Sequence, residues 1–565
     1  MGSSSSGAEE TKSSSLTDSS PTQPLLSKPF LPSLPSPDPD PSHPNNSEED
    51  DSNPNPYPHI FYNHDPRPFQ DLSFLLLFLL LLLSTFAFGI FSIAHHNPYS
   101  SKSSSFSYNS TISSCVLNSS SSSISFTISS FSFSSSSPPS SSSSFVKDLI
   151  WTLVITAILS VPFVFFLLWS LRHYTKQIVY ASLPFFIIVP IFFNVFWFVA
   201  CTVSTGCRDS FALPYRILVL VFVFLVIGIL AWIITANWHR IELTVSIVGV
   251  SAEALARNLG LLGVLPCLCV GLLVYFVPIV VFLVFARLNG RIVPKLSGGS
   301  EYHCVWKQDG WVPAYYALAI ITMIWSAAVI VEAQVYVIAG TVAQWYFSKE
   351  DSRPRRSIRS SLRNAFGPSF GTVCFSGLII GAVRVVRAAV DSAKREGASS
   401  GIVNLILRCC VGVFLSAIDF VNKFTIIFVA ITGEGYCSSA KMTYELLRRN
   451  LLSAVFVETV STRILVGIIF VLSAIYAVVV YLILNAVSAL GIEAYIVALL
   501  AWLLLIAILG YFVHVLDNVI DTVYVCYAID RDKGEVCKQE VHEVYVNLPI
   551  SRNYRPHAHR TQSIV

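Results

Sequence analysis

The chain has 565 residues, of which 53% are hydrophobic and only 13% are charged, about half the charged share of a typical soluble domain. The mean hydropathy is +0.62. A net charge of +3 is too small to favour a nucleic-acid partner. This composition excludes a soluble protein and predicts an all-α multi-span membrane protein with about ten transmembrane helices.

Residues 1–72 are rich in Ser and Pro, carry an acidic patch at Glu48–Asp51 and lack apolar periodicity. They are predicted to form a disordered cytosolic leader. The first apolar run starts at Ser73, behind this leader, so no cleavable signal peptide is expected and the run should stay as an anchor.

Ten apolar segments follow, most of them long enough to cross about 30 Å of hydrocarbon. They are Ser73–Ala94, Leu149–Leu171, Ile178–Cys201, Leu213–Ala236, Leu261–Ala286, Val312–Phe347, Gly367–Val390, Val403–Ile431, Ile464–Ala489 and Ala494–Leu516. The sixth is the longest, and it should either protrude from the bilayer or bend at Gly340.

Lys and Arg in the short loops set the orientation, because such loops stay in the cytosol. Basic loops join the second to the third span, the sixth to the seventh and the eighth to the ninth. With ten spans all three lie on one side, together with both termini. The loop at 391–401 disagrees, since it should be outside but carries Lys394 and Arg395. The alternative is that the seventh and eighth segments are partly re-entrant.

The chain thus divides into the leader, a first transmembrane helix at 73–94, a Ser-rich extracellular loop at 95–147, a nine-helix core at 148–517 and a cytosolic tail at 518–565. The extracellular loop contains sequons at Asn109 and Asn118, which predict glycosylation.

An acid stands inside the sixth span. Trp325, Val329, Glu332, Tyr336 and Gly340 follow helical spacing and form one stripe, so Glu332 lies between two aromatic residues. Aromatic faces attract organic cations, and a carboxylate balances their charge, so this stripe is a candidate cation-binding wall. The alternative is structural: Glu332 pairs with a neighbouring span and Trp325 packs against lipid. Gln334, on a second stripe, is a further candidate binding residue.

Other polar residues in the core receive structural interpretations. Asp419 and Lys423 in the eighth span are an i,i+4 pair that can neutralise itself. Asp521 and Asp530, just beyond the tenth span, are assigned to the cytosolic surface. There is no catalytic motif and no P-loop, and the twelve cysteines show no paired zinc spacing. An enzyme, a metal site and a cofactor are therefore not expected.

Four separated motifs resemble those of a known protein family. They are AGTVAQWYF at 339–347, GTVCFSGLIIGAVRVVR at 371–387, FVNKFTIIFVAITGEGYCSSA at 420–440 and DTVYVCYAID at 521–530. In this order, and with one span before a large outer loop and nine after it, the chain resembles the choline transporter-like family, also called the solute carrier 44 family. The resemblance implies a ten-span transporter of choline, in some members of ethanolamine, with both termini cytosolic. Among the exposed cysteines Cys115, Cys207 and Cys304, at most one pair is expected.

The sequence therefore predicts a transporter of choline or a related small amine, passive or gradient-driven, with membrane lipids around it and an oligomeric state left open. The plasma membrane is the expected location, and a trans-Golgi or vesicular membrane is the alternative. A second function class is a non-transporting scaffold or trafficking factor, for which Tyr545–Leu548 is a possible adaptor signal. A third is lipid handling by amphipathic helices at 237–259 and 438–451.

Overall fold

The computed structural model describes residues 62, 67–98, 106–117, 141–204, 206–207, 211–296, 302–348, 356–396, 402–487, 493–534, 536–546 and 548. The chain divides into two units, Met1–Pro58 and His59–Val565, and all described residues belong to the second. Most of the predicted leader, the sequon at Asn118 and the loop residues 397–401 lie outside the described residues.

Within the described residues, nine helices are long and apolar enough to cross a membrane. They are α1 (Leu72–Ala94), α2 (Ser141–Val203), α4 (Leu213–Ala236), α6 (Leu261–Arg287), α7 (Val312–Phe347), α9 (Phe370–Glu396), α10 (Ile402–Thr432), α11 (Tyr436–Val487) and α12 (Glu493–Lys533). The predicted all-α multi-span fold is confirmed.

Nine helices accommodate ten predicted spans because α2 contains two of them. Its 63 residues would extend about 95 Å if straight, three times the thickness of a bilayer core. The backbone leaves helical geometry at Tyr174, where φ is −128° and ψ is 26°. This kink falls inside the short basic loop predicted between the second and third spans, so each half of α2 corresponds to one span.

Four helical segments are too short or too polar to be spans. The predicted amphipathic segment at 237–259 forms α5 (Trp238–Arg257), which packs against α2, α11 and α12. The one at 438–451 is the first part of α11, which kinks at Asn450 before the ninth span begins. Two further helices are α8 (Ser357–Ala365) and α13 (Gln539–Tyr545).

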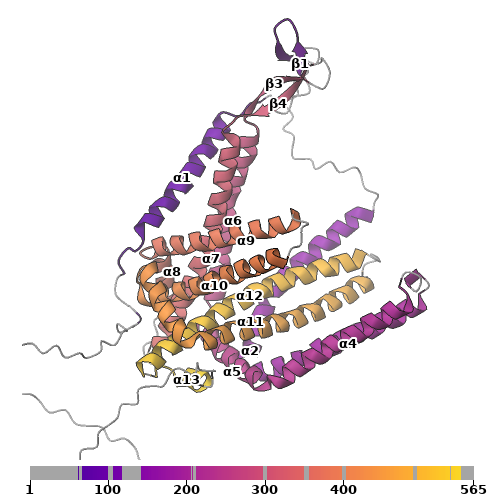
Figure 1. Ribbon diagram of the computed structural model, residues 1–565, viewed down its shortest axis with the longest axis vertical. Helices are drawn as coiled ribbons and strands as arrows, with labels where there is room; N and C mark the ends of the chain where they lie inside the picture. Colours follow the sequence, from indigo (N-terminus) through magenta and orange to yellow (C-terminus); the bar gives the residue numbers. More distant parts are fainter. Residues whose placement is uncertain are drawn as a thin grey trace, which may run out of the picture. The chain divides into compact units, whose positions relative to one another are not determined.

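Two short antiparallel hairpins fill the predicted outer loops. β1 (Phe106–Asn109) pairs with β2 (Ser114–Leu117), and β3 (Gly290–Leu296) pairs with β4 (Tyr302–Gln308). The hairpin of β3 and β4 joins α6 to α7, and α1 packs beside both helices (Figure 1).

Disulfides hold these loops together. Cys115 of β2 is bonded to Cys304 of β4, with 5.9 Å between their Cα atoms. This is the one pair that forms among the three exposed candidates, since Cys207 is bonded instead to Cys201 at the end of the third span. Disulfides form on the oxidising side of a membrane, so both bonds agree with the outer placement of these loops. Asn109, the described sequon residue, lies at the end of β1.

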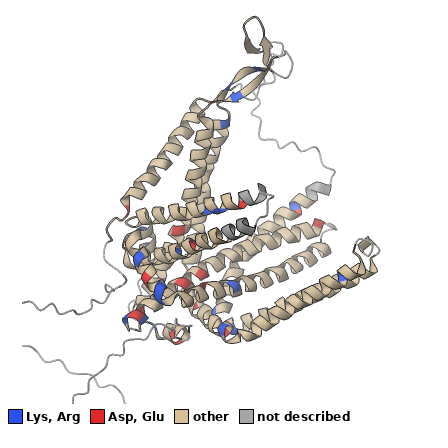
Figure 2. Cartoon of the chain, in the orientation of Figure 1, with Lys and Arg blue, Asp and Glu red and all other residues tan. Residues whose placement is uncertain are grey.

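The core is built around α7, which contacts α1, α6, α8, α9, α10 and α12. The helix runs unbroken through Gly340, so of the two alternatives for the long sixth span the bend is absent. Every residue of α7 from Glu332 to Gln344 is buried by protein. Along α1, α4 and α6, Figure 2 shows almost no charge between the helix ends, whereas α10 and α12 carry charged residues in their interiors.

Candidate functional site

Glu332 lies at the centre of a buried polar cluster. Its side chain is 6% exposed, and Oε2 accepts hydrogen bonds from Ser376 Oγ of α9 at 2.8 Å and from Asn422 Nδ2 of α10 at 3.2 Å. Ser376 and Asn422 are also bonded to each other, and the Tyr436 hydroxyl donates to Asn422 Oδ1 at 2.7 Å. We call Glu332, Ser376, Asn422 and Tyr436 the Glu332 cluster.

All the direct partners of Glu332 within this cluster are neutral. Among the described residues no Lys or Arg forms an ion pair with it. A neighbouring span does hold the acid, as the structural alternative supposed, but by neutral hydrogen-bonding groups. Ser376 and Asn422 satisfy Oε2 of Glu332 by hydrogen bonds but carry no opposite charge.

The two aromatic residues of the predicted stripe lie on the same face of α7 as Glu332, the face toward α9. The indole of Trp325 donates to the Cys374 carbonyl of α9 at 3.0 Å, and its ring meets Phe78 of α1 edge-on. The Tyr336 hydroxyl is 3.0 Å from Ser369 Oγ, directly before α9. Trp325 faces protein and is buried, contrary to the alternative that it packs against lipid.

The other two candidate binding residues face elsewhere. Gln334 donates to the Leu265 carbonyl of α6 at 3.3 Å, because two residues along a helix turn the side chain by about 200°. A Cβ on Gly340 would lie 2.8 Å from Ser361 Oγ, so this glycine lets α8 approach α7 closely. The structure therefore brings Trp325, Glu332 and Tyr336 together on one face and leaves Gln334 and Gly340 outside it.

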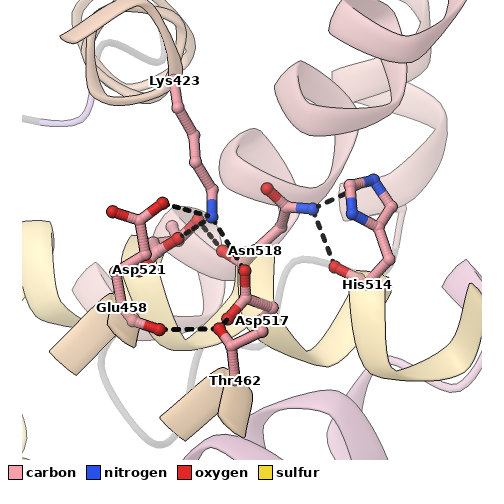
Figure 3. A network of polar contacts seen from close by, with 8 residues as sticks. Lys423, Glu458, Thr462, His514, Asp517, Asn518 and Asp521 are labelled. Atoms are coloured by element: carbon pink, nitrogen blue, oxygen red, sulfur yellow. Dashed lines mark hydrogen bonds and ion pairs between the residues drawn. The ribbon is translucent and has the colours of Figure 1, made fainter. Parts of the chain in front are cut away.

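The predicted ion pair between Asp419 and Lys423 is wrong. Asp419 pairs with Arg387 of α9 at 2.8 Å, near the protein surface. Lys423 is directed away from it and is ion-paired with three acids (Figure 3): Glu458 of α11 at 3.7 Å, Asp517 of α12 at 2.9 Å, and Asp521 of α12. A spacing of four residues permits an ion pair between Asp419 and Lys423 within α10. Lys423 instead contacts three acids on α11 and α12, which together attract its charge more strongly than one.

Around Lys423 one positive charge meets three carboxyl groups. Thr462 donates to Asp517, and Asn518 donates to the His514 carbonyl at 2.8 Å beside them (Figure 3). We call Lys423, Glu458, Asp517 and Asp521 the Lys423 cluster. It joins α10, α11 and α12 by mutual charge attraction.

The structure also corrects the assignment of Asp521 and Asp530 to the cytosolic surface, because both are 0% exposed. Asp521 belongs to the Lys423 cluster, and Asp530 accepts a hydrogen bond from Tyr346 of α7 at 2.9 Å. α12 continues as a helix to Lys533, so both acids are packed inside the bundle.

Sequence reasoning missed Ser376, Tyr436, Glu458 and Asp517. Tyr436 and Ser376 stand inside two motifs that carry the family resemblance, so they were quoted without being singled out. Glu458 and Asp517 were visible as acids beside or within apolar segments, which is the signal that identified Glu332.

Comparison with known proteins identifies the family to which the chain belongs. A family model described as plasma-membrane choline transporter matches residues 220–532. Choline transporter-like protein 2 of Dictyostelium discoideum is 24% identical over 332 residues, 55% of this chain and 50% of that protein. Choline transporter-like 2 of Anopheles gambiae is 30% identical over 170 residues, which cover 29% of this chain and 21% of that protein.

A CTL-like protein of Dictyostelium discoideum is 25% identical over 241 residues, 39% of this chain and 42% of that protein. The chain thus matches between about a fifth and a half of the length of these curated relatives. The family model covers more than half of this chain, and it includes α7, α9, α10, α11 and most of α12, which build both clusters. The chain therefore belongs to the choline transporter-like family.

Proposed function

We propose that the protein carries choline or a related small organic amine across a membrane, passively or driven by a gradient, with Glu332 as the group that balances the charge of the amine. The observation that supports this most is the buried Glu332 carboxyl, held by Ser376 and Asn422 without a cationic partner in the cluster. Ionisable residues within transmembrane helices are expensive and commonly belong to a transport path.

Trp325 and Tyr336 add the aromatic part of the site. They lie on the same face of α7, about two turns before and one turn after Glu332. A quaternary ammonium ion beside aromatic faces gains about 0.5 to 2 kcal/mol per ring, and it needs no hydrogen-bond acceptor of its own. An acid flanked by aromatic residues therefore suits choline better than an inorganic cation.

One sequence feature of the scaffold or trafficking alternative, the adaptor signal at Tyr545–Leu548, is buried at both of its ends. Tyr545 is 1% exposed and Leu548 is 4% exposed, because α13 packs against α5 and α12. An adaptor protein would have to pull both side chains out of the protein before it could bind them. For location we propose the plasma membrane, in line with the description of the matching family model, with an endomembrane as the alternative.

Uptake of labelled choline into vesicles that hold the purified protein tests this function, with and without a pH gradient. The expected result is saturable uptake above protein-free vesicles, inhibited by related amines. Absence of uptake for choline, ethanolamine and other small amines in both conditions would favour the non-transporting alternative.

A further inference from the structure

A short segment before α1 is partly buried against the helix bundle, although Phe69 within it is 68% exposed. It consists of Tyr62 and residues 67–71, which we call the N-terminal strap. Tyr62 and Arg67 are 7% exposed, although the sequence around them is polar and Pro-rich. Burial raises the pKa of the Tyr62 phenol to about 12, so the phenol is neutral and Arg67, 5.7 Å from its ring, supplies the positive charge there.

Arg67 is held at the end of α10. Its guanidinium donates to the Ala430 carbonyl at 2.9 Å, to the Val429 carbonyl at 3.4 Å, and to the Tyr336 hydroxyl at 2.5 Å. The last carbonyls of a helix lack partners within the helix and carry partial negative charge, so they attract a cation. Among the described residues Arg67 forms no ion pair with an acid, so it is held by neutral groups. If Arg67 moved away, no acid would lose an ion-pair partner.

Glycines make the space for the strap. Gly433, with φ of +78°, follows α10, and a Cβ there would lie 2.9 Å from Arg67 Cδ. A Cβ on Gly371 of α9 would lie 2.4 Å from the Gln70 carbonyl oxygen. The Gln70 amide donates to the Pro368 carbonyl at 3.2 Å. The strap is thus fitted against the ends of α9 and α10 by main-chain contacts.

The strap is connected to the Glu332 cluster by two routes. Asp71 Oδ2 accepts from the Tyr436 amide at 2.9 Å, and the Tyr436 hydroxyl donates to Asn422, which in turn donates to Glu332. By the second route, Arg67 binds Tyr336, which is one helical turn from Glu332 on α7. A movement of the strap would therefore remove the partner of the Tyr436 amide and one partner of the Tyr336 hydroxyl.

We infer that the N-terminal strap is a gate on the side of the membrane where the N-terminus lies, seated while the Glu332 cluster is closed to that side and displaced when the cluster opens to it. Arg67 and Asp71 contact Tyr336 of α7, the end of α10 and Tyr436 at the start of α11. The inference rests on the proposed function of Glu332 as the amine site. It assigns to Arg67 and Asp71 the role of positioning residues, since neither side chain contacts Glu332 itself.

The test uses a cysteine behind the strap. Ser369 is 1% exposed and contacts Tyr336, the residue to which Arg67 donates. Ser369→Cys is placed in a chain whose exposed free cysteines carry alanine, and labelling by a membrane-impermeant maleimide is followed in inside-out vesicles. The same chain without Ser369→Cys gives the background rate.

The expected result is slow labelling of the cysteine at position 369 that becomes at least severalfold faster when Arg67→Ala releases the strap. Tyr336→Phe, which removes only the hydroxyl that Arg67 binds, should give a smaller increase of the same sign. Arg359→Ala removes an exposed arginine of α8 and should leave the rate unchanged. Labelling requires no substrate, so this result is independent of whether the protein carries an amine.

An Arg67→Ala rate equal to that of Arg359→Ala would overturn the gate. If the Arg67→Ala protein does not accumulate, the labelling rate of the Tyr336→Phe variant becomes the test. An unchanged rate overturns the inference, and a faster rate supports it. Choline uptake by the same variants separates the two proposals, because faster labelling without any uptake in the parent protein would contradict the transport function and show only that the strap covers Ser369.

Discussion

The two buried clusters of the core hold their carboxyl groups with opposite kinds of partner. In the Glu332 cluster one carboxyl is held by the hydroxyl and amide of Ser376 and Asn422. In the Lys423 cluster three carboxyl groups surround one ammonium group. The first cluster holds one carboxyl among neutral hydrogen-bonding partners, while the second supplies its own cation. The contrast is the basis of our proposal that the Glu332 cluster binds a mobile cation, whereas the Lys423 cluster joins α10, α11 and α12.

The largest effect is expected for Lys423→Met, which removes the only cation of the Lys423 cluster and leaves its acids facing one another. Breaking a buried ion pair on one side typically costs about 3–5 kcal/mol, so the protein should fail to accumulate in the membrane. Accumulation is measured by size-exclusion of the detergent-solubilised protein. Adding Asp521→Asn removes one unpaired charge and should restore part of the yield; normal accumulation of Lys423→Met alone would show that the cluster is not a structural tie.

A smaller effect is expected for Trp325→Phe, which keeps an aromatic ring and loses the indole N–H that bonds Cys374. If Trp325 forms part of the cation wall, the KM for choline should rise, but by less than the roughly thirtyfold that loss of a whole cation–π contact at about 2 kcal/mol would cause, because the phenyl ring keeps part of that contact. Trp232→Phe on α4 is the matched control, because Trp232 is 70% exposed and distant from both clusters in sequence. Equal KM values for the two variants would remove Trp325 from the site.

The smallest effect is expected for Arg387→Ala. The pair of Arg387 and Asp419 lies outside the buried core, so its loss should cost less than the about 3–5 kcal/mol expected when one partner of a buried ion pair is removed. The melting temperature in detergent should therefore fall less than it does for Lys423→Met. A loss as large as that of Lys423→Met would mean that Asp419 is part of a buried network after all.

Much of the fold followed from hydropathy, since apolar runs of spanning length predicted the membrane helices, and the kink at Tyr174 falls in the basic loop predicted between two of them. The candidate site was predicted from the sequence only in part. Helical periodicity placed Trp325, Glu332 and Tyr336 on one face, because that depends on α7 alone. It could not provide the partners of Glu332 or of Lys423, since these come from helices whose rotation about their own axes leaves no trace in a single sequence. The predicted pair of Asp419 and Lys423 failed for this reason.

The structure also changes the effect on stability that is expected from a substitution at Glu332. Had Glu332 been paired with a buried cation, Glu332→Gln would leave that cation unpaired and destabilise the protein. Its partners here are neutral, and a glutamine amide can bond to the same Ser376 and Asn422 side chains. Glu332→Gln should therefore accumulate normally, in contrast to Lys423→Met.

The most direct test is choline uptake by Glu332→Gln in purified, reconstituted form, beside Glu493→Gln, which removes an exposed acid at the start of α12. Both variants should accumulate and melt like the parent protein, and Glu332→Gln alone should lose most of its saturable uptake. Unchanged uptake by Glu332→Gln, at parent levels of protein in the vesicles, would contradict the assignment of the amine site to the Glu332 cluster.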